Sequence, residues 1–224
     1  MASIVPLPRR PLDSSDRVRG WYENELGWAT LPGPPALIST GLRFDVLDVP
    51  AEAGFAALRH LGPGSPVALR GERVRLLVAA GSAEELPGLL DWLDWGTLEL
   101  DLTAIGSGGH IEAPRPWPQG TSGSASHPGR SHRSGRESSP VDRAGPQGAA
   151  VWLRPPEPGC EVEPSLPTLS ALGGGGSAPD LVRLVDTVAT HCHRIRLRRL
   201  GTQAFAFSYA SRMDAGTRPR SLTS

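Results

Sequence analysis

Residues 41–50 read Gly-Leu-Arg-Phe-Asp-Val-Leu-Asp-Val-Pro, and the apolar run within them predicts a buried β-strand over 42–49. Pro50 ends this strand, and a helix is expected to follow it. Two acids, Asp45 and Asp48, lie inside the run. A carboxylate is costly to bury unless it binds a metal, accepts hydrogen bonds or reaches water at the strand end. The stretch therefore indicates either a metal site or the remains of one.

Helix and strand signals alternate along the rest of the chain. Capping residues, apolar spacing and Gly or Pro stops predict helices over 16–26, 51–61, 82–93 and 179–199. Short apolar or alternating runs predict strands over 28–31, 37–39, 66–69, 74–79, 98–102, 110–113 and 150–153. Helices interleaved with hairpins favour an α+β fold around a mixed or antiparallel sheet, with flanking helices and a C-terminal helix.

Local sequence also predicts how two of these helices begin and which face they bury. Ser82 precedes Glu85 by three residues, the spacing of a capping box, so Ser82 is expected to cap its helix. In the helix after Pro50, the apolar residues Phe55, Leu58 and Leu61 are expected to share one face.

Composition divides the chain into a domain and flexible segments. Of its 224 residues, 27 are Gly and 23 are Pro, which is more than a compact domain requires. Residues 118–148 are rich in Gly, Pro and Ser and have too little apolar surface to offset the entropy of ordering, so we expect a disordered insertion. The expected order is an extended arm (1–15), a domain (16–158), a linker (159–177), a C-terminal helix (178–200) and a basic tail (201–224).

Positive charge is concentrated towards the C-terminus. All 23 basic residues are Arg, as codon bias in a GC-rich genome produces. The net charge of the chain is zero, yet seven arginines follow Thr190 and only one acid, Asp214, balances them. A basic tail of this kind either binds phosphates or keeps a helix end soluble, and the sequence leaves both open.

Other classes of protein are disfavoured. Two cysteines, Cys160 and Cys192, do not make a disulfide framework. No run approaches the roughly 18 apolar residues that span a bilayer, and the N-terminus lacks a long apolar signal, so we expect a cytoplasmic protein. No Walker loop, serine-nucleophile elbow or dinucleotide fingerprint is present.

The predicted C-terminal helix is strongly amphipathic. Its apolar residues fall at helical spacing: Leu181, Leu184, Val185, Val188, Cys192 and Ile195. Residues 180–199, together with the arginine-rich tail, would suit a protein partner. A stable oligomer buried through Leu181, Leu184 and Val188 would indicate a non-enzymatic interaction or regulatory module, which is the alternative function.

Five segments, in order, resemble one known family. They are 26–32 (Leu-Gly-Trp-Ala-Thr-Leu-Pro), 47–50 (Leu-Asp-Val-Pro), 71–78, 100–102 followed by 108–114, and 152–156. Together they are similar to the N-terminal domain of bifunctional DNA primase/polymerases, in the archaeo-eukaryotic primase superfamily, and the all-Arg composition suits an actinobacterial member. The resemblance covers roughly residues 18–157. It implies DNA-directed nucleotidyl transfer with two Mg²⁺ or Mn²⁺ ions.

The resemblance also implies which acids would bind metal. The family has two acids at i and i+2 in its first motif and one acid in its third. Asp48 matches the second acid of the first motif, and Asp101 matches the acid of the third. The remaining acid falls on Val46. Asp45 lies beside it but points to the opposite face of a regular strand, and only a β-bulge would bring it into the site.

The phosphate-binding part of the family pattern is incomplete. A second-motif His, associated with nucleotide phosphates, falls on Val74. Arg73, Arg75 or His110 would then be left to contact phosphate. We therefore expect a degenerate site, better suited to binding nucleotides or DNA than to catalysis. Alternatively, the two matching acids only cap a turn or a helix.

Overall fold

The computed structural model describes residues 13–116, 148–169 and 178–214, with side chains described up to Gly201. Nearly all of the predicted N-terminal arm and disordered insertion, the second part of the predicted linker and the last ten residues of the tail lie outside the described residues. Within the described ranges, no helix combines the length and apolar character that crossing a membrane requires.

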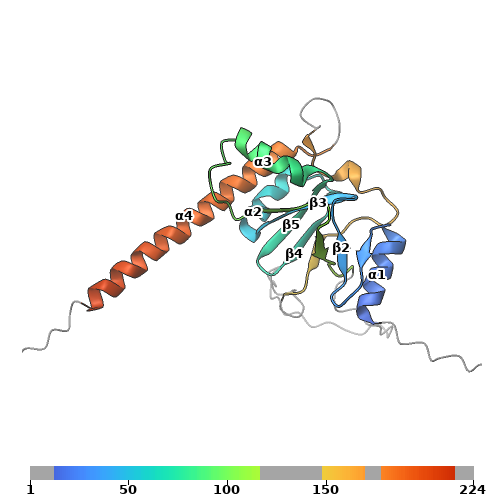
Figure 1. Cartoon of the computed structure of the whole chain (residues 1–224), viewed down its shortest axis with the longest axis horizontal. Helices are drawn as coiled ribbons and strands as arrows, with labels where there is room; N and C mark the ends of the chain where they lie inside the picture. Colours follow the sequence, from blue (N-terminus) through green and yellow to red (C-terminus); the bar gives the residue numbers. More distant parts are fainter. Residues whose placement is uncertain (1–12, 117–147, 170–177, 215–224) are drawn as a thin grey trace, which may run out of the picture.

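Two antiparallel sheets form the centre of the fold (Figure 1). The larger has the strand order β6-β3-β5-β4-β8 and the smaller β1-β2-β7, and all pairings between named strands are antiparallel. The strands are β1 (Thr30–Leu31), β2 (Leu37–Ser39), β3 (Phe44–Pro50), β4 (Val67–Arg70), β5 (Arg73–Ala79), β6 (Thr103–Ile105), β7 (His110–Glu112) and β8 (Val151–Arg154). The helices are α1 (Ser14–Glu25), α2 (Ala51–Ala57), α3 (Ser82–Trp92) and α4 (Leu181–Asp214), with 3₁₀ turns η1 (Leu58–His60) and η3 (Glu163–Ser165). The predicted α+β class and C-terminal helix are confirmed.

Strand β3 is the central strand, as its sequence predicts. All seven of its residues are buried, and it pairs with β5 along its whole length and with β6 on its other side. Because successive side chains of a strand alternate between faces, Leu47 and Val49 enter one hydrophobic cluster while Phe44 and Val46 enter another. The two faces of β3 therefore supply the two halves of the core.

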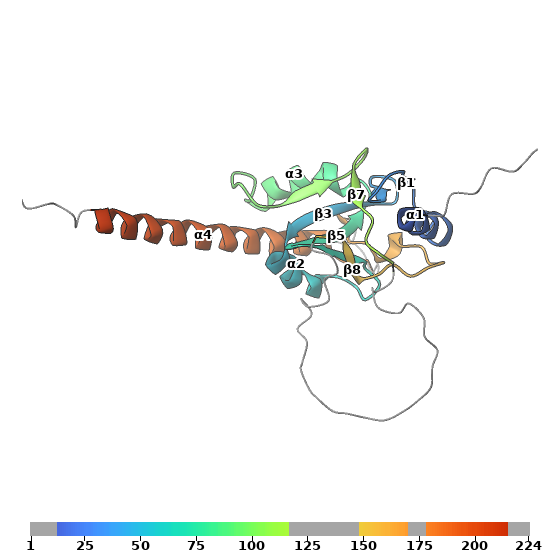
Figure 2. The same ribbon diagram turned by 90° about the horizontal axis from the view of Figure 1, so that it is seen from below.

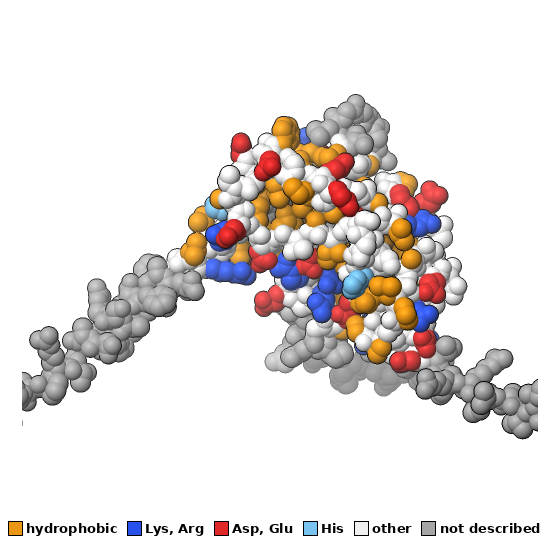
Figure 3. Space-filling view, in the orientation of Figure 1, with side chains coloured by type: hydrophobic (Ala, Val, Ile, Leu, Met, Phe, Trp, Pro, Cys, Tyr) orange, Lys and Arg blue, Asp and Glu red, His pale blue; other side chains and the backbone are white. Residues whose placement is uncertain are grey.

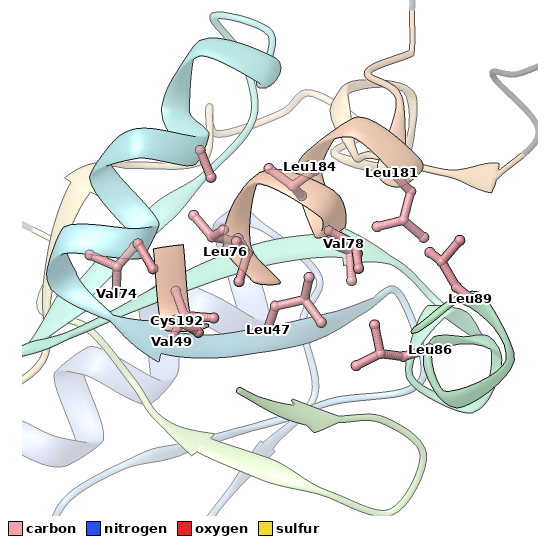
Figure 4. Close-up of a cluster of buried hydrophobic side chains, with 14 of the residues drawn as sticks. Leu47, Val49, Val74, Leu76, Val78, Leu86, Leu89, Leu181, Leu184 and Cys192 are labelled. Atoms are coloured by element: carbon pink, nitrogen blue, oxygen red, sulfur yellow. The ribbon is translucent and has the colours of Figure 1, made fainter. Parts of the chain in front are cut away.

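The first hydrophobic cluster lies between the sheet and helices α2, α3 and α4 (Figure 4). The apolar stripe predicted for the C-terminal helix is buried in it: Leu181, Leu184, Val185, Val188, Cys192 and Ile195. Each large apolar side chain buried in this way contributes about 1.5–3 kcal/mol. The stripe packs within its own chain and is therefore not open to an oligomer interface, while contact of a partner with the other faces of residues 180–199 stays a prediction.

The second hydrophobic cluster lies under α1 and the smaller sheet. Tyr22 is fully buried there, and its hydroxyl donates to the carbonyl oxygen of Pro114 at 2.5 Å and accepts from Trp152 Nε1 at 2.8 Å. Burial raises the pKa of Tyr22 far above its usual value, so the phenol stays neutral. Val162 and Leu166 also enter this cluster, so the first part of the predicted linker is packed on the domain.

The prediction about α2 is wrong at one residue, and the prediction of a strand before β6 is wrong. Leu58 and Leu61 pack against the first hydrophobic cluster, as predicted, but Phe55 is half exposed. The fully buried residues of α2 are small, Ala53, Gly54 and Ala57, and a Cβ at Gly54 would overlap the side chain of Val74. The strand predicted over 98–102 is irregular chain, and the paired residues are those of β6.

The predicted cap of α3 and the predicted end of α4 are also wrong. Ser82 is the first helical residue of α3, and Gly81, with a φ of 91°, occupies the N-cap position. The amide of Ala83 instead donates to Asp45 Oδ2 on β3, at 2.9 Å. Helix α4 continues through Gly201 to Asp214, since a glycine costs a helix only about 1 kcal/mol. Figures 1 and 2 show α4 packed beside α2 and then extending well beyond the domain.

Candidate functional site

Asp48 lies in a polar row that crosses the larger sheet. Its strand neighbours are Arg75 on β5 and Thr103 on β6, and paired residues in antiparallel strands point to the same face. Arg75 Nε donates to Asp48 Oδ2 at 3.0 Å, and Arg73 Nε donates to Asp48 Oδ1. Arg73 Nη2 also donates to the carbonyl oxygen of Asp48, at 2.8 Å. Since Asp48 is only 8% exposed, two guanidinium groups hold an almost buried carboxylate.

The same Arg73 reaches the second predicted metal ligand. Its Nη1 donates to Asp101 Oδ1 at 2.7 Å, while Arg199 Nη1 of α4 donates to Asp101 Oδ2 at 3.5 Å. Burial alone lowers the pKa of Arg73, but its hydrogen bonds to Asp48 and Asp101 and their charges raise it above the usual value. The structure thus brings Asp48 and Asp101 together, as predicted, and bridges them with a permanent cation.

This arrangement does not fit the two-metal centre that the resemblance implies. Hard cations need several carboxylate oxygens with free lone pairs, and here both oxygens of Asp48 and both of Asp101 accept from arginine. Across the described ranges, no group of three or more His, Cys, Asp or Glu residues is placed to hold a metal ion. Mg²⁺ or Mn²⁺ would have to displace Arg73.

Asp45 does not join this site. The register between β3 and β5 is regular, without a bulge, so Asp45 points to the face opposite that of Asp48, as predicted for a regular strand. It is fully buried, accepts from the Ala83 amide through Oδ2, and its Oδ1 has no hydrogen-bond partner among the described residues. Desolvation raises the pKa of Asp45, and the charge of Glu84 adds to this, against hydrogen bonds from backbone amides, that of Ala83 foremost.

Helix α4 brings three more arginines to the edge that carries Asp101. Beside Arg199, Arg196 Nη1 donates to the carbonyl oxygen of Glu99 at 2.6 Å and its Nη2 to Glu99 Oε2 at 3.0 Å. Arg198 donates to Glu52 at the start of α2, and this bond is the largest cause of the lowered pKa of Glu52. Figure 3 shows blue and red side chains lying side by side on this face of the domain.

We call this set the arginine cluster: Arg73, Arg75, Arg196, Arg198 and Arg199. Four carboxylates face it, from Asp48, Glu52, Glu99 and Asp101, which leaves one positive charge in excess. Arg75 is only 6% exposed, and its Nη1 has no hydrogen-bond partner among the described residues. A buried guanidinium with an unused donor is costly and suits an anionic ligand or a water.

The other candidate, His110, lies in the smaller sheet. It is exposed at the start of β7, opposite Ser39, and none of the hydrogen bonds or ion pairs found among the described residues links it to the arginine cluster. Its neighbour Glu112 pairs instead with Arg70, at 2.9 Å. His110 therefore does not replace the missing His of the second motif.

Sequence reasoning missed Arg196, Arg198 and Arg199 as members of this site. They were visible only as part of a basic C-terminal region. Their partners Glu52 and Glu99 lie about a hundred residues or more away in the chain, so proximity along the sequence carried no signal.

Comparisons with protein-family models, with curated proteins and with solved structures each found no match. The resemblance to primase/polymerase domains therefore stays a prediction.

Proposed function

We propose that this protein binds the phosphate groups of nucleotides or nucleic acid at the arginine cluster, without catalysing nucleotidyl transfer. The observation that carries the proposal is the position of Arg73, whose guanidinium joins Asp48 and Asp101. On this view the fold is a primase/polymerase-like domain whose metal-binding acids have become partners of arginine.

The chemistry of polymerisation argues against catalysis here. Two metal ions about 4 Å apart normally stabilise the attacking and leaving oxygens, and they need carboxylates to neutralise them. In this chain Asp48 is already neutralised by Arg73 and Arg75. Bringing two divalent cations to the same place would set them against a fixed guanidinium charge.

The same residues favour phosphate binding. Guanidinium groups donate two parallel hydrogen bonds to phosphate oxygens and keep their charge at all physiological pH values. The cluster brings five of them together with a positive charge in excess, and four of the side chains, all but that of Arg75, are a third or more exposed. Such a surface binds the sugar-phosphate backbone without reading its sequence.

Binding of a labelled single-stranded oligonucleotide and of labelled ATP, followed by fluorescence anisotropy across a salt series, tests the proposal. We expect affinity that falls as salt rises, and about tenfold weaker binding by Arg196→Gln/Arg199→Gln, with a salt slope for the single strand reduced by about 0.7 for each arginine that contacts phosphate. Arg183→Gln is the matched control, because Arg183 lies on the same helix and pairs with Asp180 at 3.4 Å, away from the cluster. Equal binding by all three proteins would contradict the proposed site.

Primer extension and de novo priming with Mg²⁺ or Mn²⁺ test the other half of the proposal. We expect no incorporation by the wild type above that of Asp48→Ala and Asp101→Ala. Incorporation by the wild type that both substitutions abolish would show that the metal site is intact and that the protein is a polymerase.

A second function, binding of a protein partner, is favoured by the length of α4. The helix continues to Asp214, and Figures 1 and 2 show its last turns leaving the domain. A helix without tertiary packing is marginally stable in water below about 12–15 residues, so a partner would stabilise this end. Light scattering of the full chain and of a chain ending at Leu200 tests this, since an equal number of subunits per particle would remove oligomerisation as the reason for the extension.

A further inference from the structure

Three exposed carboxylates form ion pairs with the arginines of α4 at the candidate site. Glu52, Glu99 and Asp101 come from the start of α2 and from the segment before β6, and they accept hydrogen bonds from Arg198, Arg196 and Arg199 respectively. A carboxylate offers a guanidinium the same pair of oxygen acceptors as a phosphate does. Each of these acids therefore takes up donors that a phosphate ligand would need.

We infer that Glu52, Glu99 and Asp101 compete within the chain with phosphate-bearing ligands for the arginine cluster and so set its affinity. The inference rests on the proposed function, because it concerns the regulation of the same site.

These three acids are more exposed to solvent than Asp48 is. Glu99 is 91% exposed in its side chain, and Glu52 and Asp101 are about half exposed, so each can exchange its arginine for water or for another anion at little cost to the fold. Asp48 is nearly buried between Arg73 and Arg75, and losing it would leave the buried Arg75 without its carboxylate, whereas Arg73 would keep Asp101. Asp48 is therefore structural, while the three exposed acids are exchangeable.

If Asp101 competes with ligands, its substitution should strengthen anion binding, whereas the substitution of a metal ligand should weaken binding. A metal ligand that is changed to its amide loses metal and any binding that depends on it. A competitor that is changed to its amide releases Arg199 and one donor of Arg73, so binding of an anion becomes tighter. The sign of one measurement thus distinguishes the two roles.

The experiment measures binding of fluorescein-labelled oligo(dT) of about 20 nucleotides, long enough to cover a single-strand site, in a buffer without divalent cations. We expect Asp101→Asn to bind severalfold more tightly than the wild type. The triple variant Glu52→Gln/Glu99→Gln/Asp101→Asn should be tighter still, with a salt slope steeper by about 2, since each released arginine adds about 0.7 for a single strand. Glu99→Gln, at the most exposed of the three positions, is a second single variant should Asp101→Asn fold poorly.

Glu163→Gln is the matched control. Glu163 pairs with Arg43 at 2.8 Å, and Arg43 adjoins the start of β3, at the opposite end of the strand from Asp48. The substitution removes the same single negative charge from a similar ion pair away from the cluster. Tighter binding by Asp101→Asn and not by Glu163→Gln supports competition, whether or not the wild type binds measurably. Equal gains by both variants would reduce the effect to net charge and overturn the inference.

Two further outcomes distinguish the inference from the proposed function. Measurable binding by the wild type and unchanged binding by Asp101→Asn, Glu99→Gln and the triple variant would overturn competition and leave the proposed function standing. No binding by the wild type or by any variant would overturn both.

Discussion

Asp45 and Asp48 lie three residues apart on the same buried strand, and their surroundings differ in every respect. Asp48 faces a row of side chains and is held by Arg73 and Arg75. Asp45 faces helix α3, accepts one backbone amide from Ala83 and keeps an oxygen without a described partner. The comparison teaches that the face of the strand on which a buried acid lies decides whether it meets a cation of the next strand or a helix end.

The largest effect is expected when Asp48 loses its carboxylate. Asp48→Ala leaves the nearly buried Arg75 without its anion, while Arg73 keeps Asp101, and breaking a buried ion pair in this way costs about 3–5 kcal/mol. Urea denaturation at neutral pH measures the loss. Replacing both partners, as in Asp48→Leu/Arg75→Met, should recover most of it, because no buried charge at Arg75 then remains unpaired. A loss below about 1 kcal/mol in the single variant would show that the pair is solvated.

A smaller effect is expected at Asp45, where the partner is a backbone amide. Asn keeps an oxygen that accepts from the Ala83 amide, whereas Ala does not. Asp45→Asn should therefore be more stable than Asp45→Ala by about 0.5–2 kcal/mol, the usual worth of a helix cap. Amide hydrogen exchange in the first turn of α3 gives an independent reading, since faster exchange should appear only in the Ala variant. Equal stabilities would mean that Asp45 does not cap α3.

Much of the fold could be predicted because its elements have a local periodicity that matches their burial. Strand β3 and the stripe of α4 are examples. The segment 98–102 shows where this fails: Leu100 and Leu102 pack against the first hydrophobic cluster while Glu99 and Asp101 hold arginines. The alternation that predicted a strand is real, but a strand also needs a neighbour to pair with. Strand β3 already pairs with β5 on one side and with β6 on the other, so the segment 98–102 has no place beside it.

The site was predictable only in part, for a related reason. Asp48 and Asp101 were expected to lie together, and they do, through Arg73. The position of Arg73 follows from the pairing of β5 with β3, whereas the addition of Arg196 and Arg199 depends on how a helix from the end of the chain packs on the domain. No local pattern contains that information.

The pH dependence of stability provides a third test of the contrast. Because burial raises the pKa of Asp45, the folded protein binds its proton more tightly than the unfolded chain does. This contribution favours the folded state below the unfolded value of 3.8 and is lost as pH rises through the higher folded pKa. Asn does not titrate, so Asp45→Asn should gain stability relative to the wild type across that window and keep the gain at higher pH. Urea denaturation from about pH 3 to about pH 8 measures it, and a constant difference would show that the pKa is not raised.

The exposed acids should matter much less for stability than either strand acid. Glu99→Gln removes one exposed ion pair and Asp101→Asn removes two partly exposed ones, with Arg73 and Arg199, and such pairs contribute about 0–1 kcal/mol each. Thermal denaturation of both variants should therefore give midpoints close to that of the wild type. A loss as large as that of Asp48→Ala would show that the arginines of α4 hold the domain together, and would remove the distinction between structural and exchangeable acids.

The smallest effect is expected from the segment that joins Pro116 to Gly148. Both of its stems are held by the domain: the Arg115 amide donates to the carbonyl oxygen of Ala150 at 3.2 Å, and the Ala150 amide donates to Glu112 Oε1 at 3.4 Å. The sequence predicts a disordered insertion here, and shortening such a loop by half changes its closure entropy by only about 0.6 kcal/mol, in the stabilising direction. Deleting residues 125–140 should therefore leave the free energy of unfolding unchanged within that amount, as urea denaturation measures it. A marked destabilisation would mean that this segment packs on the domain, and that the two faces of β3 do not by themselves account for its stability.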